Sequence, residues 1–217
     1  MDAALQLGAP VRCAGETVGT LVDVVLDPAT RRLTHLVVET NQGPVRAVPF
    51  ELLTPGSVPR EVALSCTPEE LHALEPIREF AYLRFDEFPA PDADTDVGVE
   101  DMQVLPTYDA AEFGGYTGEL DSAVGVTYDR IPSGEAELRR SSAVVSSDGH
   151  EVGHLDGFLV HDGDVTHIVL ERGHLWGTRA VTIPVEAVET IQTDKVTVRL
   201  SKDEIGALPS VRRNFPF

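Results

Sequence analysis

Short apolar runs separated by turn-forming residues dominate the two ends of the chain. Residues 17–27 and 151–161 are both rich in Val and Leu and contain an internal Gly, which is typical of a bent or bulged β-strand. Turn-forming residues follow each run, DPAT at 27–30 and DGD at 162–164. The pattern therefore predicts a series of short strands at each end of the chain.

Each series is predicted to continue with further short strands. They are expected at 33–39, 45–49 and 61–65 in the first series, and at 165–171, 180–184 and 195–200 in the second. About five strands in about 60 residues are too few to cover both faces of an open sheet. Closure of each series into a small barrel is expected, because closure removes exposed strand edges.

The two series align with each other. Residues 15–21 (GETVGTL) match residues 149–155 (GHEVGHL), and residues 33–39 (LTHLVVE) match residues 165–171 (VTHIVLE). The matches keep the same order, with small insertions between them. We infer an internal duplication.

Each copy is predicted to end in a short helix. Thr67 with Glu70, and Ser201 with Glu204, have the Ser/Thr-x-x-Glu spacing of a capping box, in which each side chain bonds the backbone N–H of the other residue. Apolar residues at helical spacing follow both caps, so we expect each helix to lie on its barrel.

These segments resemble the PRC-barrel family, known from the cytoplasmic domain of the photosynthetic reaction-centre H subunit and from the C-terminal domain of a ribosome maturation factor. The resemblance covers about residues 7–76 and 140–209, and its segments in the first copy are GxxVGxL, LTHLVV, VPFE and TPEEL. It implies a mostly β protein with two tandem small barrels, each closed by a short capped helix. It also implies a role in assembly and protein contact, and it carries over no functional residues.

The charge of the chain is concentrated in its middle. The 217 residues carry a net charge of -19, and residues 86–137 hold 14 acidic residues against one basic residue. Strong negative charge opposes binding to phosphate backbones, so nucleic acid is not expected as a partner. We predict a first barrel at 1–80, an acidic and partly ordered connector at 81–137, and a second barrel at 138–217.

The connector leaves several interpretations open. Its early part, near 89–96, has the composition of a solvated linker. Phe113, Tyr116, Tyr128 and Ile131 punctuate its later part, where they could pack as irregular chain across both barrels or contact a partner. Mimicry of nucleic acid by the acidic residues is a third interpretation.

The sequence contains candidate functional residues but no catalytic or nucleotide-binding motif. Walker loops, HExxH, GxSxG and CxxC are absent from the sequence. Histidine is a common metal ligand, and the second copy holds five of the seven, although their spacing does not suit one site. They are His150, His154, His161, His167 and His174. We expect no resident metal or other cofactor, and His167 shares a structural place with His35 in the first copy.

An inserted loop of the second copy supplies the candidate partner contacts. Trp176, the only Trp, is flanked there by His174 and Arg179. Trp and Arg are enriched at the centres of protein interfaces, so these three residues are predicted to bind a partner. The alternative is that the loop folds over its own barrel or over the connector.

The two cysteines are expected as reduced, buried thiols. Cys13 lies on an early strand and Cys66 near the end of a late strand, which could make them neighbours in a closed barrel. At the corresponding offset the second copy has Ser147 and Leu200.

The sequence thus predicts a non-enzymatic interaction, assembly or regulatory module. A protein partner is expected, and a homodimer is possible. No apolar run approaches the roughly 18 residues of a membrane span, and the first residues do not have the pattern of a signal peptide, so a cytoplasmic location is predicted. The alternative is a metal- or small-ligand-binding regulatory protein that uses the His-rich second barrel.

Overall fold

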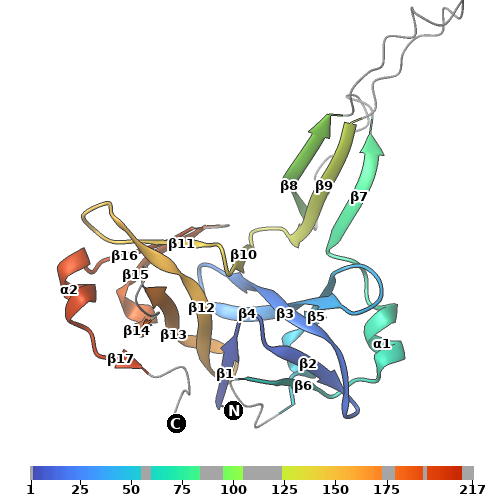
Figure 1. Ribbon diagram of the computed structural model, residues 1–217, viewed down its shortest axis with the longest axis horizontal. Coiled ribbons are helices and arrows are strands. Elements are labelled where there is room, and N and C mark those ends of the chain that lie inside the picture. Colours follow the sequence, from blue (N-terminus) through green and yellow to red (C-terminus); the bar gives the residue numbers. More distant parts are fainter. Residues whose placement is uncertain are drawn as a thin grey trace, which may run out of the picture. The chain divides into compact units, whose positions relative to one another are not determined.

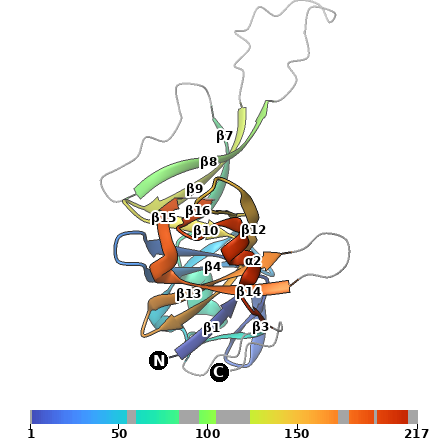
Figure 2. The same cartoon turned by 90° about the vertical axis from the view of Figure 1, so that its left-hand side faces the viewer.

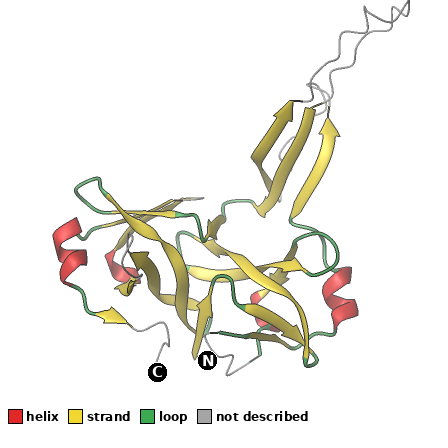
Figure 3. Ribbon diagram, viewed as in Figure 1, coloured by secondary structure: helices red, strands yellow, loops and turns green. Residues whose placement is uncertain are grey.

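The computed structural model describes residues 2–54, 60–83, 95–104, 124–172, 179–192 and 195–211. Strands predominate over helices, so the predicted mostly β class is confirmed (Figure 3). The chain forms two compact units, Met1–Pro76 with Gly134–Phe217, and Ile77–Ser133. Both copies of the repeat lie in the first unit.

The first unit is built around one hydrogen-bonded sheet that curls on itself (Figures 1 and 2). Its strands are β1 (Asp2–Gln6), β2 (Pro10–Cys13), β3 (Glu16–Asp27), β4 (Arg32–Thr40), β5 (Arg46–Pro49), β6 (Val62–Leu64), β10 (Ala136–Arg139), β11 (Ala143–Val145), β12 (Glu151–His161), β13 (Asp164–Arg172), β14 (Arg179–Pro184), β15 (Val188–Gln192), β16 (Lys195–Val198) and β17 (Ser210–Val211). Each of the eight strands expected from the apolar pattern is present, with ends shifted by at most two residues.

The two copies exchange their first strands. β1, at the start of the first copy, pairs antiparallel with β12 of the second copy, and β10 pairs in the same way with β3 of the first copy (Figure 1). Neither β1 nor β10 belongs to the predicted strands. The predicted boundary between residues 137 and 138 falls inside β10, and the one between 80 and 81 falls inside β7 (Arg78–Leu83).

The exchange follows from the length of the two longest strands. In β3, residues 16–20 pair with β2, and residues 23–26 pair with β10. In β12, residues 151–154 pair with β11, and residues 157–161 pair with β1. The other edge of these two strands pairs with β4 and β13 of the same copy. The edge that β2 or β11 covers only in part has no further partner in its own copy, and the other copy supplies the missing backbone hydrogen bonds.

The turns predicted after the longest strands also meet each other. The backbone N–H of Leu33 donates to the carbonyl of Gly163 (2.9 Å), and the N–H of Val165 donates to the carbonyl of Arg31 (3.1 Å). These residues occupy matching places in the two copies. The reciprocal bonds indicate an approximate two-fold relation between the copies.

One apolar core runs through both copies. It includes Leu5, Leu36 and Leu138 together with Phe158 and Ile168, each at most 1% exposed. Because residues of both copies fill the same core, neither copy has a hydrophobic core of its own.

The internal glycines lie at close backbone approaches, and the predicted strand irregularity is present nearby. A Cβ on Gly19 would collide with the carbonyl oxygen of Glu39, and one on Gly153 with that of Glu171. The pairing register shifts between Leu21 and Asp23 on β3, and at the matching place on β12. Glycine is therefore required by space at both bends.

The helices α1 (Pro68–Ala73) and α2 (Lys202–Ala207) begin at the two predicted capping boxes. In each helix the cap side chain accepts from the N3 backbone N–H, and the N3 glutamate accepts from the cap N–H. Leu71 and Ile205 point into the core and are fully buried. Two short 3-10 helices, η1 (Phe50–Leu52) and η3 (Val185–Ala187), also occupy matching places.

The second unit contains an antiparallel sheet in the order β7-β9-β8, where β8 is Thr95–Val104 and β9 is Val124–Pro132. The interpretation of this stretch as irregular chain is wrong for Tyr128 and Ile131, which lie on the regular strand β9. Its acidic composition concealed the strands. Phe113, Tyr116 and residues 89–94 lie outside the described residues.

Candidate functional site

An open hollow of about 390 Å³ lies where the chain crosses from one copy to the other. The turn Gln6–Pro10 forms its floor, and the side chains of Arg60 and Arg140 line it. We refer to it below as the arginine hollow.

The crossing turns explain why this hollow exists. In the first turn, the N–H of Ala9 donates to the carbonyl of Gln6 (3.1 Å), and the second turn repeats this bond from Ser142 to Arg139 (2.9 Å). The first turn is tied to both copies, because Leu7 N–H donates to Asp156 (2.9 Å) on β12 and Gly8 N–H donates to Leu21 (2.7 Å) on β3.

Gly8 lets the two crossings approach each other. Its φ of +89° favours glycine, and a Cβ there would lie 3.5 Å from Nη1 of Arg140, which belongs to the second crossing turn. The hollow is therefore shared between the copies.

Two arginines give the hollow a positive charge, although the protein as a whole is acidic. Arg60 and Arg140 are both exposed, and arginine stays protonated at physiological pH. Nη2 of Arg140 lies 3.5 Å from Oε2 of Glu171, whose carboxylate partly neutralises it. The arrangement suits a ligand with a carboxylate or another planar anion, which guanidinium groups bind through paired N–H donors.

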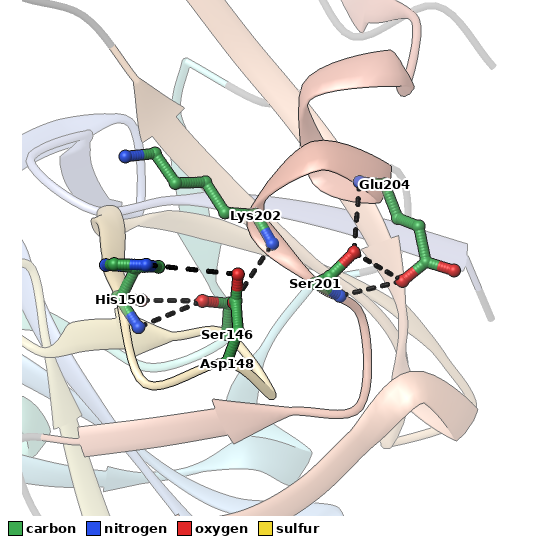
Figure 4. Close-up of polar contacts among 6 residues, drawn as sticks. All are labelled: Ser146, Asp148, His150, Ser201, Lys202 and Glu204. Atoms are coloured by element: carbon green, nitrogen blue, oxygen red, sulfur yellow. Dashed lines mark hydrogen bonds and ion pairs between the residues drawn. The ribbon is translucent and has the colours of Figure 1, made fainter.

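A second polar cluster lies at the start of α2 (Figure 4). Oδ1 of Asp148 accepts a hydrogen bond from the backbone N–H of Lys202 (3.1 Å), the first residue of the helix. Pro68 occupies this position in α1 and has no N–H to satisfy. The turn that carries Asp148 thus supplies an acceptor that only the second copy needs.

The cluster contains Ser, His and Asp but is not a catalytic triad. The hydroxyl of Ser146 donates to the carbonyl of His150 (2.9 Å) rather than to its ring, and Nε2 of His150 is 4.0 Å from Oδ2 of Asp148. The Ser146 hydroxyl and the Lys202 N–H beside Asp148 lower the pKa of its carboxyl. The pKa of Glu204 is lowered by the backbone N–H and hydroxyl of Ser201. These bonds fix the turn and the helix start.

The histidines are dispersed. His150, His154 and His161 are exposed, and each lies within 4.0 Å of a carboxylate oxygen of a neighbouring acid. Nδ1 of His35 is 3.1 Å from Oγ1 of Thr34, and His167 stands in the same relation to Thr166 at 3.2 Å. His35 and His167 thus share one structural place, as predicted. Within the described part of the chain, no three His, Cys, Asp or Glu side chains are grouped to hold a metal ion.

The predicted partner contacts fall largely outside the described residues. His174 and Trp176 lie in 173–178, which the structure does not describe. Arg179 is the first residue of β14, paired in register with Arg172. Their role stays a prediction. The sequence did not predict Arg60 and Arg140 as site residues. They are far apart in the chain, and only the strand exchange brings them together.

The two cysteines are neighbours, one of the arrangements that the sequence left open. Sγ of Cys13 lies 3.5 Å from Sγ of Cys66, and both residues are buried. Burial, with a further contribution from Cys66, raises the pKa of Cys13 to about 12. The strand register places Ser146, and not Ser147, at the position of Cys13 in the second copy, because the turn after it is one residue longer.

Comparison with known proteins gives no match, since neither a protein-family model nor a curated protein sequence matches the chain. The resemblance to the PRC-barrel family therefore rests on the residues quoted above. Among the described residues, no helix has the length and apolar character needed to span a membrane.

Proposed function

We propose that this protein is a non-enzymatic interaction or assembly module. In this proposal, two PRC-type barrels, each covered by its capped helix and interlocked by strand exchange, form a rigid body that binds an acidic segment of a partner protein at the arginine hollow. The observation that carries the proposal is the pairing of Arg60 and Arg140 around one concave surface of a protein with a net charge of -19.

The two arginines of the hollow indicate which charges the partner segment carries. Two guanidinium groups that stay protonated favour carboxylates at short range. The negative charge elsewhere on the protein acts over longer distances, where salt at physiological strength screens it beyond about 8 Å. A segment with one or two carboxylates in otherwise neutral or basic surroundings fits both conditions.

The backbone supports such a role. Both crossing turns are held by hydrogen bonds to the long strands, so the floor of the hollow is fixed before a partner arrives. Binding to a fixed surface costs less conformational entropy than binding to a loop that must be ordered.

Cross-linking in the protein's own cells tests the proposal. Wild-type protein is expected to form a stoichiometric complex, detected by native mass spectrometry, with cross-links beside the hollow. The Arg60→Glu/Arg140→Glu variant is expected to lose most of this complex. Arg199→Glu, which changes an exposed arginine away from the hollow, is the matched control and is expected to keep it. Equal capture by all three proteins would contradict the proposed site.

The His-rich second barrel remains an alternative binding hypothesis, because His174 lies outside the described residues. Incubation with a chelator tests it directly. A lowered melting temperature that recovers on addition of zinc would favour the alternative over the interaction module.

A further inference from the structure

The fold brings together the two cysteines of the chain, which are 53 residues apart in sequence. Cys13 is the last residue of β2, and Cys66 directly precedes Thr67, the N-cap of α1. β2 and β6 pair in parallel, with Cys13 opposite Leu64. The thiol pair therefore bridges the sheet and the start of the helix.

We propose that Cys13 and Cys66 form a reversible disulfide when the protein meets a peroxide, and that this bond ties β2 to the start of α1 in the first copy only. Disulfides that do form in reducing compartments are usually transient and catalytic or redox-sensing. The inference is independent of the proposed partner binding.

The geometry favours this bond. The two sulfur atoms are 3.5 Å apart and must approach to about 2.05 Å, a change that small side-chain rotations in adjacent segments can supply. Cys13 is 0% exposed and Cys66 is 6% exposed. Cys66 is thus the thiol that a small oxidant reaches first.

The reaction balances in two steps. The Cys66 thiolate attacks hydrogen peroxide, which gives the sulfenic acid of Cys66 and, after proton transfer, one water molecule. The Cys13 thiolate then attacks the sulfenic sulfur, which forms the disulfide and releases a second water. Two thiols are oxidised by two electrons, and the peroxide is reduced.

Burial controls the rate of the second step. Because the pKa of Cys13 is raised to about 12, little thiolate is present at neutral pH. The bond is therefore expected to form slowly at pH 7 and faster at pH 9.

The second copy lacks this pair of cysteines. Ser146 occupies the place of Cys13, and its hydroxyl already bonds the backbone of His150. Leu200 matches Cys66 in the aligned sequence. Oxidation therefore acts on only one of the two copies of the repeat.

Mass spectrometry of the full-length native protein tests the proposal. Hydrogen peroxide treatment is expected to lower the intact mass by about 2 Da, with a linked Cys13–Cys66 peptide after digestion. The melting temperature is expected to rise by about 5–10 °C and to return after dithiothreitol. An unchanged mass under peroxide, or a disulfide only between two chains, would overturn the inference.

Single variants separate the two thiols. In Cys13→Ala, Cys66 is expected to accumulate as a sulfenic acid that dimedone labels. In Cys66→Ala, Cys13 is expected to stay a thiol, because it is 0% exposed to peroxide and its raised pKa leaves little thiolate. Equal dimedone labelling of both variants would contradict the assigned order of reaction. The wild-type mass measurement needs no variant, so it stays decisive even where a substitution prevents folding.

Discussion

Leu5 of β1 lies directly opposite Phe158 of β12, and both side chains are buried in the shared core. The two residues belong to different copies of the repeat. The second copy is thus completed by the first residues of the chain, and the first copy is completed by β10.

The exchange predicts that the two copies unfold together. Leu5→Ala is expected to lower the free energy of unfolding by about 2–5 kcal/mol, because it opens a cavity in the common core. Calorimetry should show one transition for the first unit, shifted to lower temperature as a whole. The matching change Leu138→Ala in β10 should have the same effect. A separate transition for each copy in either variant would contradict this prediction.

A glycine on β12 tests the position of β1. A Cβ at Gly157 would collide with the carbonyl oxygen of Leu5, so Gly157→Ala is expected to cost about 3 kcal/mol or more. Gly15→Ala is the control, because its Cβ meets nothing within 4 Å. In that variant only the backbone strain of a non-glycine residue at a φ of +90° lowers the free energy of unfolding, by about 1–2 kcal/mol. Denaturant unfolding measures both, and equal losses would contradict the pairing of β1 with β12.

Two neighbouring arginines are expected to differ in their contribution to stability. Arg139 lies 2.8 Å from the carboxylate of Glu137, which is fully buried. Arg139→Met removes one ion-pair partner of this buried carboxylate and is expected to cost about 3–5 kcal/mol. Arg140→Met breaks only the more exposed contact with Glu171 and is expected to cost at most about 1 kcal/mol. Similar losses in chemical denaturation would show that Glu137 does not depend on Arg139.

The caps are expected to stabilise both helices to similar extents. Thr67→Ala and Ser201→Ala each remove a side-chain acceptor for an N3 backbone N–H, which costs about 1 kcal/mol. Thermal unfolding of each variant, compared with Thr190→Ala at an exposed strand position, checks the prediction. A loss no larger than that of the control would count against a stabilising cap.

Acid is expected to weaken the start of α2. The pKa values of Asp148 and Glu204 are lowered in the folded protein from ordinary values of 3.8 and 4.5. Their contribution is fully present above the unfolded-state pKa, and it is lost as the pH falls through the folded-state pKa. The melting temperature of the wild type should therefore fall more steeply below about pH 5 than that of Asp148→Asn/Glu204→Gln. Parallel curves would contradict the role of these carboxyls.

Part of the strand exchange has a signal in the sequence. Residues 2–6 (DAALQ) match residues 135–139 (EAELR) in the order acid, Ala, any residue, Leu. This match places one strand ahead of each predicted copy. The partner of that strand could not be predicted, because the pattern of a strand does not reveal which sheet edge it joins.

The sequence by itself determined much of the local structure of the first unit. Apolar runs and turn residues located the eight main strands, the internal glycines indicated the bends, and the Thr67 and Ser201 caps set the helix starts. These features depend on neighbours along the chain, so their patterns are readable without the fold. The acidic composition of residues 86–137 hid the strands β8 and β9, because charge there outweighed the β pattern.

Only the tertiary structure decided which distant residues meet. It paired Leu5 with Phe158, brought Arg60 and Arg140 around one hollow, and set the sulfur atoms of Cys13 and Cys66 3.5 Å apart. Some of these contacts depend on which strands complete the backbone hydrogen bonds of the long strands β3 and β12. The others depend on how the sheet curls so that strands distant in sequence become neighbours. Those choices are set by the free energy of the whole fold, so no local pattern in the sequence records them.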